Sequence, residues 1–154
     1  MIIIRKAKVE DIPEIYKHIH LGYVKKYCHK HEEDEWEKHR KWYAFLINSP
    51  AYLLYTIEDM AGKFLGTVKF ELHENEAVIN IYLCEDIRGK GYSESVVKLS
   101  VEELKFEKPE IQKVIAYILE ENEISIKIFS KTGFEYKGKK EYMGVKHLFY
   151  TKEI

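Results

Sequence analysis

Hydrophobic and polar residues follow two different periods along this chain, which separates candidate strands from candidate helices. Apolar or alternating runs predict strands near residues 2–6, 51–58, 63–73, 76–84, 113–119, 134–140 and 145–152. Apolar residues at helical spacing predict helices near residues 10–20, 32–48, 92–106 and 122–131. The stretches Ala61-Gly62-Lys63 and Glu74-Asn75 are typical of hairpin turns. Strands that first follow one another and then alternate with helices predict an α/β domain with a mixed sheet and helices on both faces.

Length and composition limit the classes of function. A chain of 154 residues predicts a single domain, residues 1–154, with a real core. A formal net charge of −1 gives no electrostatic reason to expect nucleic acid or an anionic membrane as a partner. No apolar run approaches membrane-spanning length, and residues 1–4 are too short for a signal sequence. With only Cys28 and Cys84, no disulfide framework is expected, which favours a reducing, cytoplasmic location.

A basic turn with two glycines separates a predicted strand from a predicted helix at residues 88–93. Gly89 and Gly91 let the backbone fold so that several N–H groups, and the positive end of the next helix, point into one concavity. Arg88 and Lys90 add positive charge beside it. The turn therefore predicts a phosphate site, although such turns also occur without a ligand. It is neither a Walker loop nor a Rossmann fingerprint, because the glycine spacings of both are missing.

A second segment downstream strengthens this interpretation. Residues 114–119 are typical of a buried strand, and Asn122 suits the N-cap of the helix that follows. Ile124 and Ile128 form the apolar stripe of that helix, and Gly133 suits the position just after its end.

Together these two segments resemble the GNAT superfamily of acetyl-CoA-dependent N-acetyltransferases. The family's phosphate loop, Arg/Gln-x-x-Gly-x-Gly/Ala, corresponds to Arg88, Gly91 and Ser93, with serine in place of the last small residue. Its later signature corresponds to Asn122, Ser125, Ile126, Lys131, Gly133 and Phe134. The resemblance covers the whole chain in the order of its elements and residues 76–134 in motif detail. It implies the GNAT-like acyl-CoA acyltransferase fold, with a mixed, mostly antiparallel sheet of about seven strands flanked by four helices.

The resemblance also implies acetyl-CoA as co-substrate. In the family the pantetheine arm runs beside the fourth strand, and Asn122 would reach the arm from the opposite side, although helix capping alone also explains this residue. A backbone N–H of the strand would polarise the thioester carbonyl. The residues expected to contact the cofactor are Ile81, Leu83, Cys84, Arg88, Gly89, Lys90, Gly91, Tyr92, Ser93, Asn122, Phe129 and Lys131.

Phe129 departs from the family, which usually has a tyrosine there to protonate the departing thiolate. Phenylalanine cannot donate a proton, but a thiol pKa near ~8.5 makes the thiolate a tolerable leaving group at neutral pH. The alternative donors are Tyr117, Tyr136, Tyr142 or water.

For the general base we predict Glu76, at the start of the fourth strand, where some relatives carry a catalytic glutamate. Glu71 and His73, near the end of the third strand, are rivals, and many relatives use a chain of water molecules instead.

Residues 20–48, which cover the substrate cleft in this family, are rich in aromatic side chains. His39, Trp42 and Tyr43 resemble a His-x-x-Trp-Phe element of acetyltransferases that act on 4-amino nucleotide sugars of the pseudaminic acid pathway, and of ribosomal-protein acetyltransferases. We expect these three and His73 to contact the acceptor, although Tyr43, like Trp36, is also explained as core.

No metal is expected. The histidines and cysteine of this region, His18, His20, Cys28, His29 and His31, lack the matching second pair of ligands that structural zinc requires.

Three functional interpretations remain open. The first is acetylation of a small amine such as an amino-sugar nucleotide, and the second is acetylation of a protein N-terminus or lysine. The third is a non-catalytic acyl-CoA sensor, suggested by Phe129. The last strands also permit a homodimer.

Overall fold

The computed structural model describes residues 1–18 and 32–154. The described part of the chain opens with β1 (Ile2–Lys6), a 3-10 turn (Val9–Asp11) and helical residues 12–18. The remaining elements are α2 (Glu32–Asn48), β2 (Tyr52–Asp59), β3 (Phe64–His73), β4 (Glu76–Leu83), a 3-10 turn (Glu85–Ile87), α3 (Tyr92–Glu107), β5 (Lys113–Ile118), α4 (Glu123–Lys131), β6 (Glu135–Tyr142) and β7 (Val145–Glu153). The predicted positions 19–31, with the end of the first helix and with His20, Cys28, His29 and His31, lie outside the described residues.

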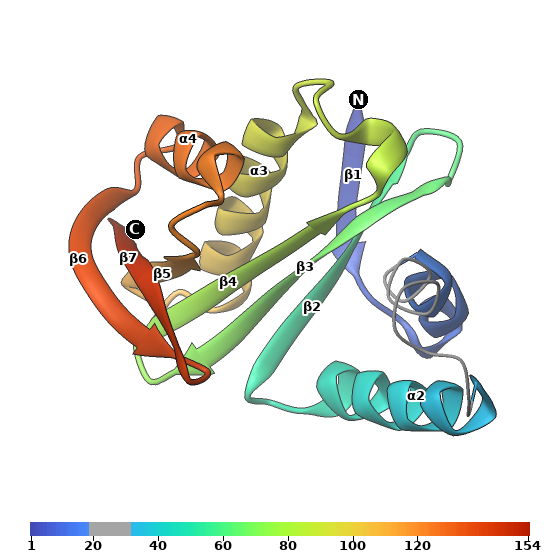
Figure 1. Ribbon diagram of the computed structural model, residues 1–154. Helices are drawn as coiled ribbons and strands as arrows, with labels where there is room; N and C mark the ends of the chain where they lie inside the picture. Colours follow the sequence, from blue (N-terminus) through green and yellow to red (C-terminus); the bar gives the residue numbers. More distant parts are fainter. Residues whose placement is uncertain (19–31) are drawn as a thin grey trace.

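A seven-stranded sheet in the order β1-β2-β3-β4-β5-β7-β6 forms the centre of the molecule. Only β4 and β5 run parallel, and every other neighbouring pair is antiparallel. Helices α3 and α4 lie on one side of the sheet, and residues 12–18 and α2 lie on the other (Figure 1). The predicted mixed, mostly antiparallel sheet with helices on both faces is confirmed.

Local signals in the sequence set the ends of the elements. The Asn122 side chain accepts a hydrogen bond from the Ser125 N–H at 3.1 Å, so it caps α4 as predicted. Gly133, with a φ of +94°, follows the end of that helix. The predicted strand 76–84 stops at Leu83, because Cys84 already begins the 3-10 turn that leads to the glycine turn.

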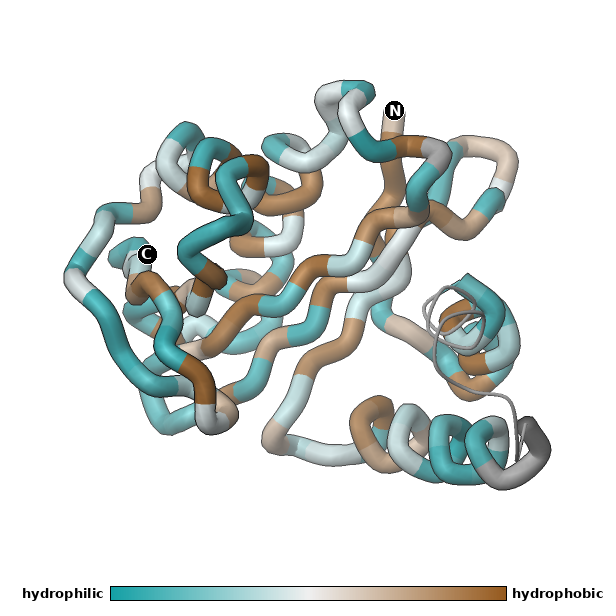
Figure 2. The backbone as a smooth tube through the Cα atoms, viewed as in Figure 1, coloured by the Kyte–Doolittle hydropathy of each residue, from teal (hydrophilic) through white to brown (hydrophobic). Residues whose placement is uncertain are grey.

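The core lies mainly between the sheet and α3. Phe70 and Ile79 on the strands belong to the same buried cluster as Val97 and Leu104 on the helix. Figure 2 shows hydrophobic residues along the central strands and the inner sides of the helices, whereas the edge strand β6 is hydrophilic. Lysines on β6 hinder another strand from pairing with this edge.

Gly66 allows the closest approach of two strands. It faces Leu83 across the β3–β4 pair, and a Cβ at this position would lie 2.1 Å from the Tyr82 carbonyl oxygen. Only glycine therefore lets the end of β4 keep its place beside β3.

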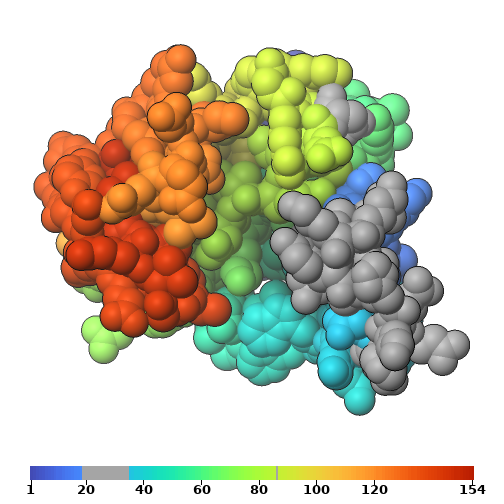
Figure 3. Space-filling view, in the orientation of Figure 1, coloured from blue at the N-terminus to red at the C-terminus, as the bar shows by residue number. Residues whose placement is uncertain are grey.

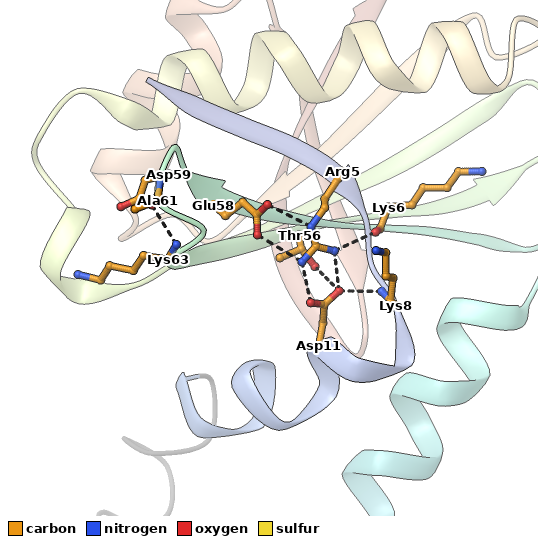
Figure 4. Close-up of polar contacts among 9 residues, drawn as sticks. All are labelled: Arg5, Lys6, Lys8, Asp11, Thr56, Glu58, Asp59, Ala61 and Lys63. Atoms are coloured by element: carbon orange, nitrogen blue, oxygen red, sulfur yellow. Dashed lines mark hydrogen bonds and ion pairs between the residues drawn. The ribbon is translucent and has the colours of Figure 1, made fainter.

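A charged cluster attaches the first helical turn to β1 and β2 (Figure 4). The Arg5 guanidinium donates two hydrogen bonds of 2.8 Å to the Asp11 carboxylate and lies 3.2 Å from Glu58. The Lys8 N–H and the Thr56 hydroxyl also donate to Asp11, at 2.7 and 3.3 Å. Burial opposes the charge of Asp11, but the hydrogen bonds from Arg5 and Lys8 outweigh it, so the pKa of Asp11 is lowered.

Candidate functional site

The sheet opens between β4 and β5. The two strands pair only through residues 76–78 and 113–115, and beyond them they separate. The Cys84 N–H donates to the Leu65 carbonyl of β3 at 2.8 Å. Because backbone direction alternates along a strand, Ile81 and Leu83 turn their N–H and C=O groups toward the open edge, where the Leu83 carbonyl already accepts a hydrogen bond from Arg88 Nε. This half of β4 therefore offers a strand edge to a peptide-like ligand.

A cavity of about 350 Å³ lies along this open edge. It is lined by residues of β4, of the glycine turn with the start of α3, and of α4: Ile81, Tyr82, Leu83, Arg88, Ser93, Asn122, Ile124, Ser125, Ile128 and Phe129. In Figure 3 it is a hollow between the yellow-green turn after β4 and the orange atoms of α4, with green β4 atoms at its floor.

The glycine turn forms one end of the cavity. Gly89 and Gly91 have φ values of +77° and +80°, in the left-handed region that favours glycine. Gly91 is the N-cap of α3, and no side chain caps this helix, so its first N–H groups and its dipole are open to an anion. The Arg88 Nε donates to the Leu83 carbonyl at 2.9 Å, which attaches the turn to the end of β4.

Helix α4 forms the opposite wall. Asn122 lines the cavity while it caps the helix, so both interpretations of this residue are compatible. The ring of Phe129 is buried and meets Phe134 edge-on, with 4.9 Å between ring centroids. Lys131 does not line the cavity; it is exposed and lies 3.7 Å from Glu94 in the first turn of α3.

The structure gathers most of the predicted cofactor residues around this cavity. Gly89, Lys90, Gly91 and Tyr92 form the turn at its end, and the other predicted contacts, apart from Lys131 and Cys84, line it. The Cys84 thiol is buried and points toward the Phe64 carbonyl, on the β3 side.

The predicted base and acceptor residues are more scattered. Glu76 lies where β4 and β5 are still paired, 3.9 Å from the Lys113 ammonium. His73 is opposite Glu76 in the β3–β4 register. His39 is buried and stacks on Tyr43 with ring centroids 4.2 Å apart, whereas Trp42 is exposed.

One cluster contains four residues that the sequence analysis considered separately as a base or as a proton donor: Glu71, His73, Tyr117 and Tyr142. The Tyr142 hydroxyl donates to Glu71 at 3.4 Å, and the Tyr142 ring stacks on Tyr117 with centroids 4.1 Å apart. His73 Nε2 lies 2.9 Å from the other Glu71 oxygen. Burial, together with the charge of nearby carboxylates, raises the pKa of Tyr117 and of Tyr142, so both phenols stay protonated at neutral pH.

Two kinds of feature are absent from the described residues. Within residues 1–18 and 32–154, no group of three or more His, Cys, Asp or Glu residues is arranged to hold a metal ion. In the same part of the chain, no helix combines the length and the apolar character needed to cross a membrane.

Two solved structures with a similar fold are those of acetyltransferases. Spermidine N-acetyltransferase from Vibrio cholerae, solved with CoA and spermine, superposes with a TM-score of 0.81 at 16% identity, covering 99% of this chain and 95% of that one. Aminoglycoside acetyltransferase AAC(6')-Ib, solved with coenzyme A and kanamycin, gives a TM-score of 0.82 at 16% identity with the same coverage. Among curated proteins no sequence match was found. The sequence matches the family model for an acetyltransferase (GNAT) domain over residues 1–135, and the chain therefore belongs to the GNAT family of N-acetyltransferases.

Proposed function

We propose that this enzyme transfers the acetyl group of acetyl-CoA to a primary amine of a small molecule by direct attack on the thioester. The observation that carries the proposal is the position of the glycine turn at one end of the cavity beside the open half of β4. The glycine turn would bind the pyrophosphate of acetyl-CoA, and the open half of β4 next to it would bind the peptide-like pantetheine arm.

The cofactor would be bound mainly by backbone atoms. Its diphosphate would accept hydrogen bonds from the N–H groups of residues 89–93, with Arg88 and Lys90 nearby. The pantetheine arm would lie along Ile81 and Leu83, whose backbone groups turn toward the open edge, and Asn122 would close the opposite side. Two solved structures of the same fold contain coenzyme A, which supports this assignment.

The chemistry requires one proton to leave the ammonium before attack. The free amine adds to the thioester carbonyl, whose developing negative charge a backbone N–H of β4 would stabilise. The C–S bond then breaks, and the amide nitrogen loses a second proton as CoA leaves as a thiol, so that one proton is released overall.

Glu76 stays our prediction for the base that takes the first proton from the ammonium. Phe129 cannot protonate the thiolate, so water, Tyr117 or Tyr142 would do so. Tyr136 is a less suitable donor, since it packs on Tyr150 of the outer strand pair.

The acceptor is predicted to be a small amine. The two solved relatives were obtained with spermine and with kanamycin, which are both small amines. Acetylation of a protein amine, use of an amino-sugar nucleotide and a homodimer through the last strands stay predictions.

The test combines binding and turnover. Titration calorimetry with acetyl-CoA should show one site, and release of free thiol should follow addition of a suitable amine from a panel of amino sugars, polyamines and peptides. Absence of acetyl-CoA binding would contradict the proposal. Binding with turnover excludes the acyl-CoA sensor, and reaction only with peptides would contradict a small acceptor.

A further inference from the structure

The Glu71 cluster lies on the sheet face opposite α3 and α4. Tyr52 and Val78 are the cross-strand neighbours of Glu71, so their side chains point to the same face. Tyr142 contacts Glu71 on β3 and stacks on Tyr117 of β5. It therefore crosses the line along which β4 and β5 separate, next to the open half of β4 where the thioester would lie.

Glu71 has no lysine or arginine partner among the described residues. Within the described part of the chain its polar contacts are His73, whose side chain is 57% exposed, and the neutral phenol of Tyr142. This contrasts with Asp11, which is held by the Arg5 guanidinium on the same face of the sheet. A carboxylate beside two stacked phenol rings suits an organic ammonium ion, which the charge and the ring faces both attract.

Aromatic side chains continue from this cluster onto α2. Trp42 and Phe45 stack with centroids 5.7 Å apart, and each lies 6.2 Å from the ring of Tyr52. Trp42 is 45% exposed and Phe45 is 53% exposed, so these rings are not core. Because Tyr52 is the register partner of Glu71, the exposed rings and the carboxylate form one continuous strip. In Figure 3 the red β6–β7 hairpin and the cyan atoms of α2 border a hollow with green strand atoms between them.

We propose, on the basis of the function above, that Glu71 binds the ammonium group of the acceptor and that the acceptor carries a ring as well as this amine. The stacked Tyr117 and Tyr142 form the wall beside the ammonium, and the ring of the acceptor packs on Trp42 and Phe45. A linear polyamine would gain less from the faces of Trp42 and Phe45 than a ring would, because a ring can stack on them.

Four probe amines test the class of acceptor: 2-phenylethylamine and glucosamine, which carry rings, and butylamine and spermidine, which do not. With saturating acetyl-CoA, kcat/KM for at least one ring-bearing amine should exceed that for butylamine by about tenfold or more. Trp42→Ala should remove most of this preference, because kcat/KM for the ring-bearing amine should fall much more than kcat/KM for butylamine. A preference for spermidine, or an unchanged ratio in Trp42→Ala, would overturn the assignment of the ring site.

Glu71→Gln tests the ammonium site. It should lower kcat/KM for the best probe by about 10- to 100-fold, mainly through a higher KM, since a charged hydrogen bond is lost. Glu141→Gln is the matched control, because it removes the same charge from the exposed neighbour of Tyr142 on β6. Equal kinetics of Glu71→Gln and Glu141→Gln would overturn the role of Glu71.

Acetyl-CoA binding distinguishes a wrong acceptor site from a wrong cofactor site. Acetyl-CoA affinity, measured by calorimetry, should be the same in the wild type, Glu71→Gln and Trp42→Ala. If the wild type does not bind acetyl-CoA, the proposed function fails. If all three proteins bind it and no probe amine reacts with the wild type, the acceptor site inferred here is wrong while the cofactor site stands.

Discussion

At the scale of single residues, the cofactor site depends more on backbone than on side chains. Ile81 contributes because of the direction of its N–H and C=O groups, Leu83 through its N–H, and Gly91 because it tolerates a positive φ at the start of α3. Side chains of other types could replace the two apolar residues with little effect on the hydrogen bonds, but the glycine could not be replaced.

Gly91→Glu is expected to weaken acetyl-CoA binding by about 100-fold or more, because it adds bulk and negative charge where phosphate oxygens would approach backbone amides. The matched control is Gly62→Glu in the β2–β3 turn. Both glycines have similar φ values, +80° and +86°, and open space at the Cβ position, so the backbone strain should be similar. Calorimetry gives the affinity and thermal melting the stability. Equal affinity in the two variants would contradict the phosphate site.

Phe129→Tyr is expected to be tolerated, because the ring lines the cavity. Turnover should rise if protonation of the thiolate limits the rate, since a positioned acid then replaces water. Phe134→Tyr is the control: this ring is buried against Phe129 and does not line the cavity, so its hydroxyl should cost about 1–3 kcal/mol of stability without any gain in rate. If kcat of Phe129→Tyr equals that of the wild type at every pH, protonation of the thiolate does not limit the rate.

At the scale of elements, the sequence is a good guide where a signal is local. Helix α4 was predictable because Asn122 and Gly133 mark its ends, and the glycine turn because its residues are contiguous. The contact between Tyr142 and Glu71 was not predictable, since 71 positions separate them and it depends on how β6 and β7 return across the sheet. The burial of His39 beside the exposed Trp42 likewise depends on which side of α2 meets β2.

The attachment of the first helical turn to the sheet gives a prediction on stability. Asp11→Asn should lower the free energy of unfolding by about 1–2 kcal/mol at neutral pH, because charged hydrogen bonds to Arg5 are lost. The pKa of Asp11 is lowered in the folded protein, so its contribution is present above the unfolded-state pKa of about 3.9 and is lost as the pH falls through the folded value. Urea unfolding at pH 7 and near pH 3 should therefore show that the difference in free energy of unfolding between Asp11→Asn and the wild type is smaller at the lower pH.

Glu10→Gln, an exposed change in the same turn, is the control and should have little effect on the free energy of unfolding at either pH. A constant difference between Asp11→Asn and the wild type would contradict the titration of Asp11.

At the scale of the whole molecule, the sheet consists of two parts that meet along a short parallel junction. Strands β1–β4 form one part and β5–β7 the other, and only residues 76–78 and 113–115 pair between them. The contacts of Lys131 with Glu94 and of Tyr142 with Glu71 also join the parts, one on each face of the sheet. A cofactor in the cavity would touch both parts, since β4 and the glycine turn belong to one and α4 to the other.

Acetyl-CoA should therefore stabilise the entire domain. A ligand that binds only the folded state at about 100 times its Kd adds roughly 2.7 kcal/mol to the free energy of unfolding. For a chain of this length that corresponds to a rise in Tm of about 5–10 °C. Gly91→Glu should lose this rise, whereas Glu71→Gln should keep it, because the acceptor strip lies on the other face of the sheet from α3 and α4. If Glu71→Gln also lost the rise, the cofactor and acceptor sites would not be separate. If the wild type showed no rise, the cavity between β4 and α4 would not be where acetyl-CoA binds.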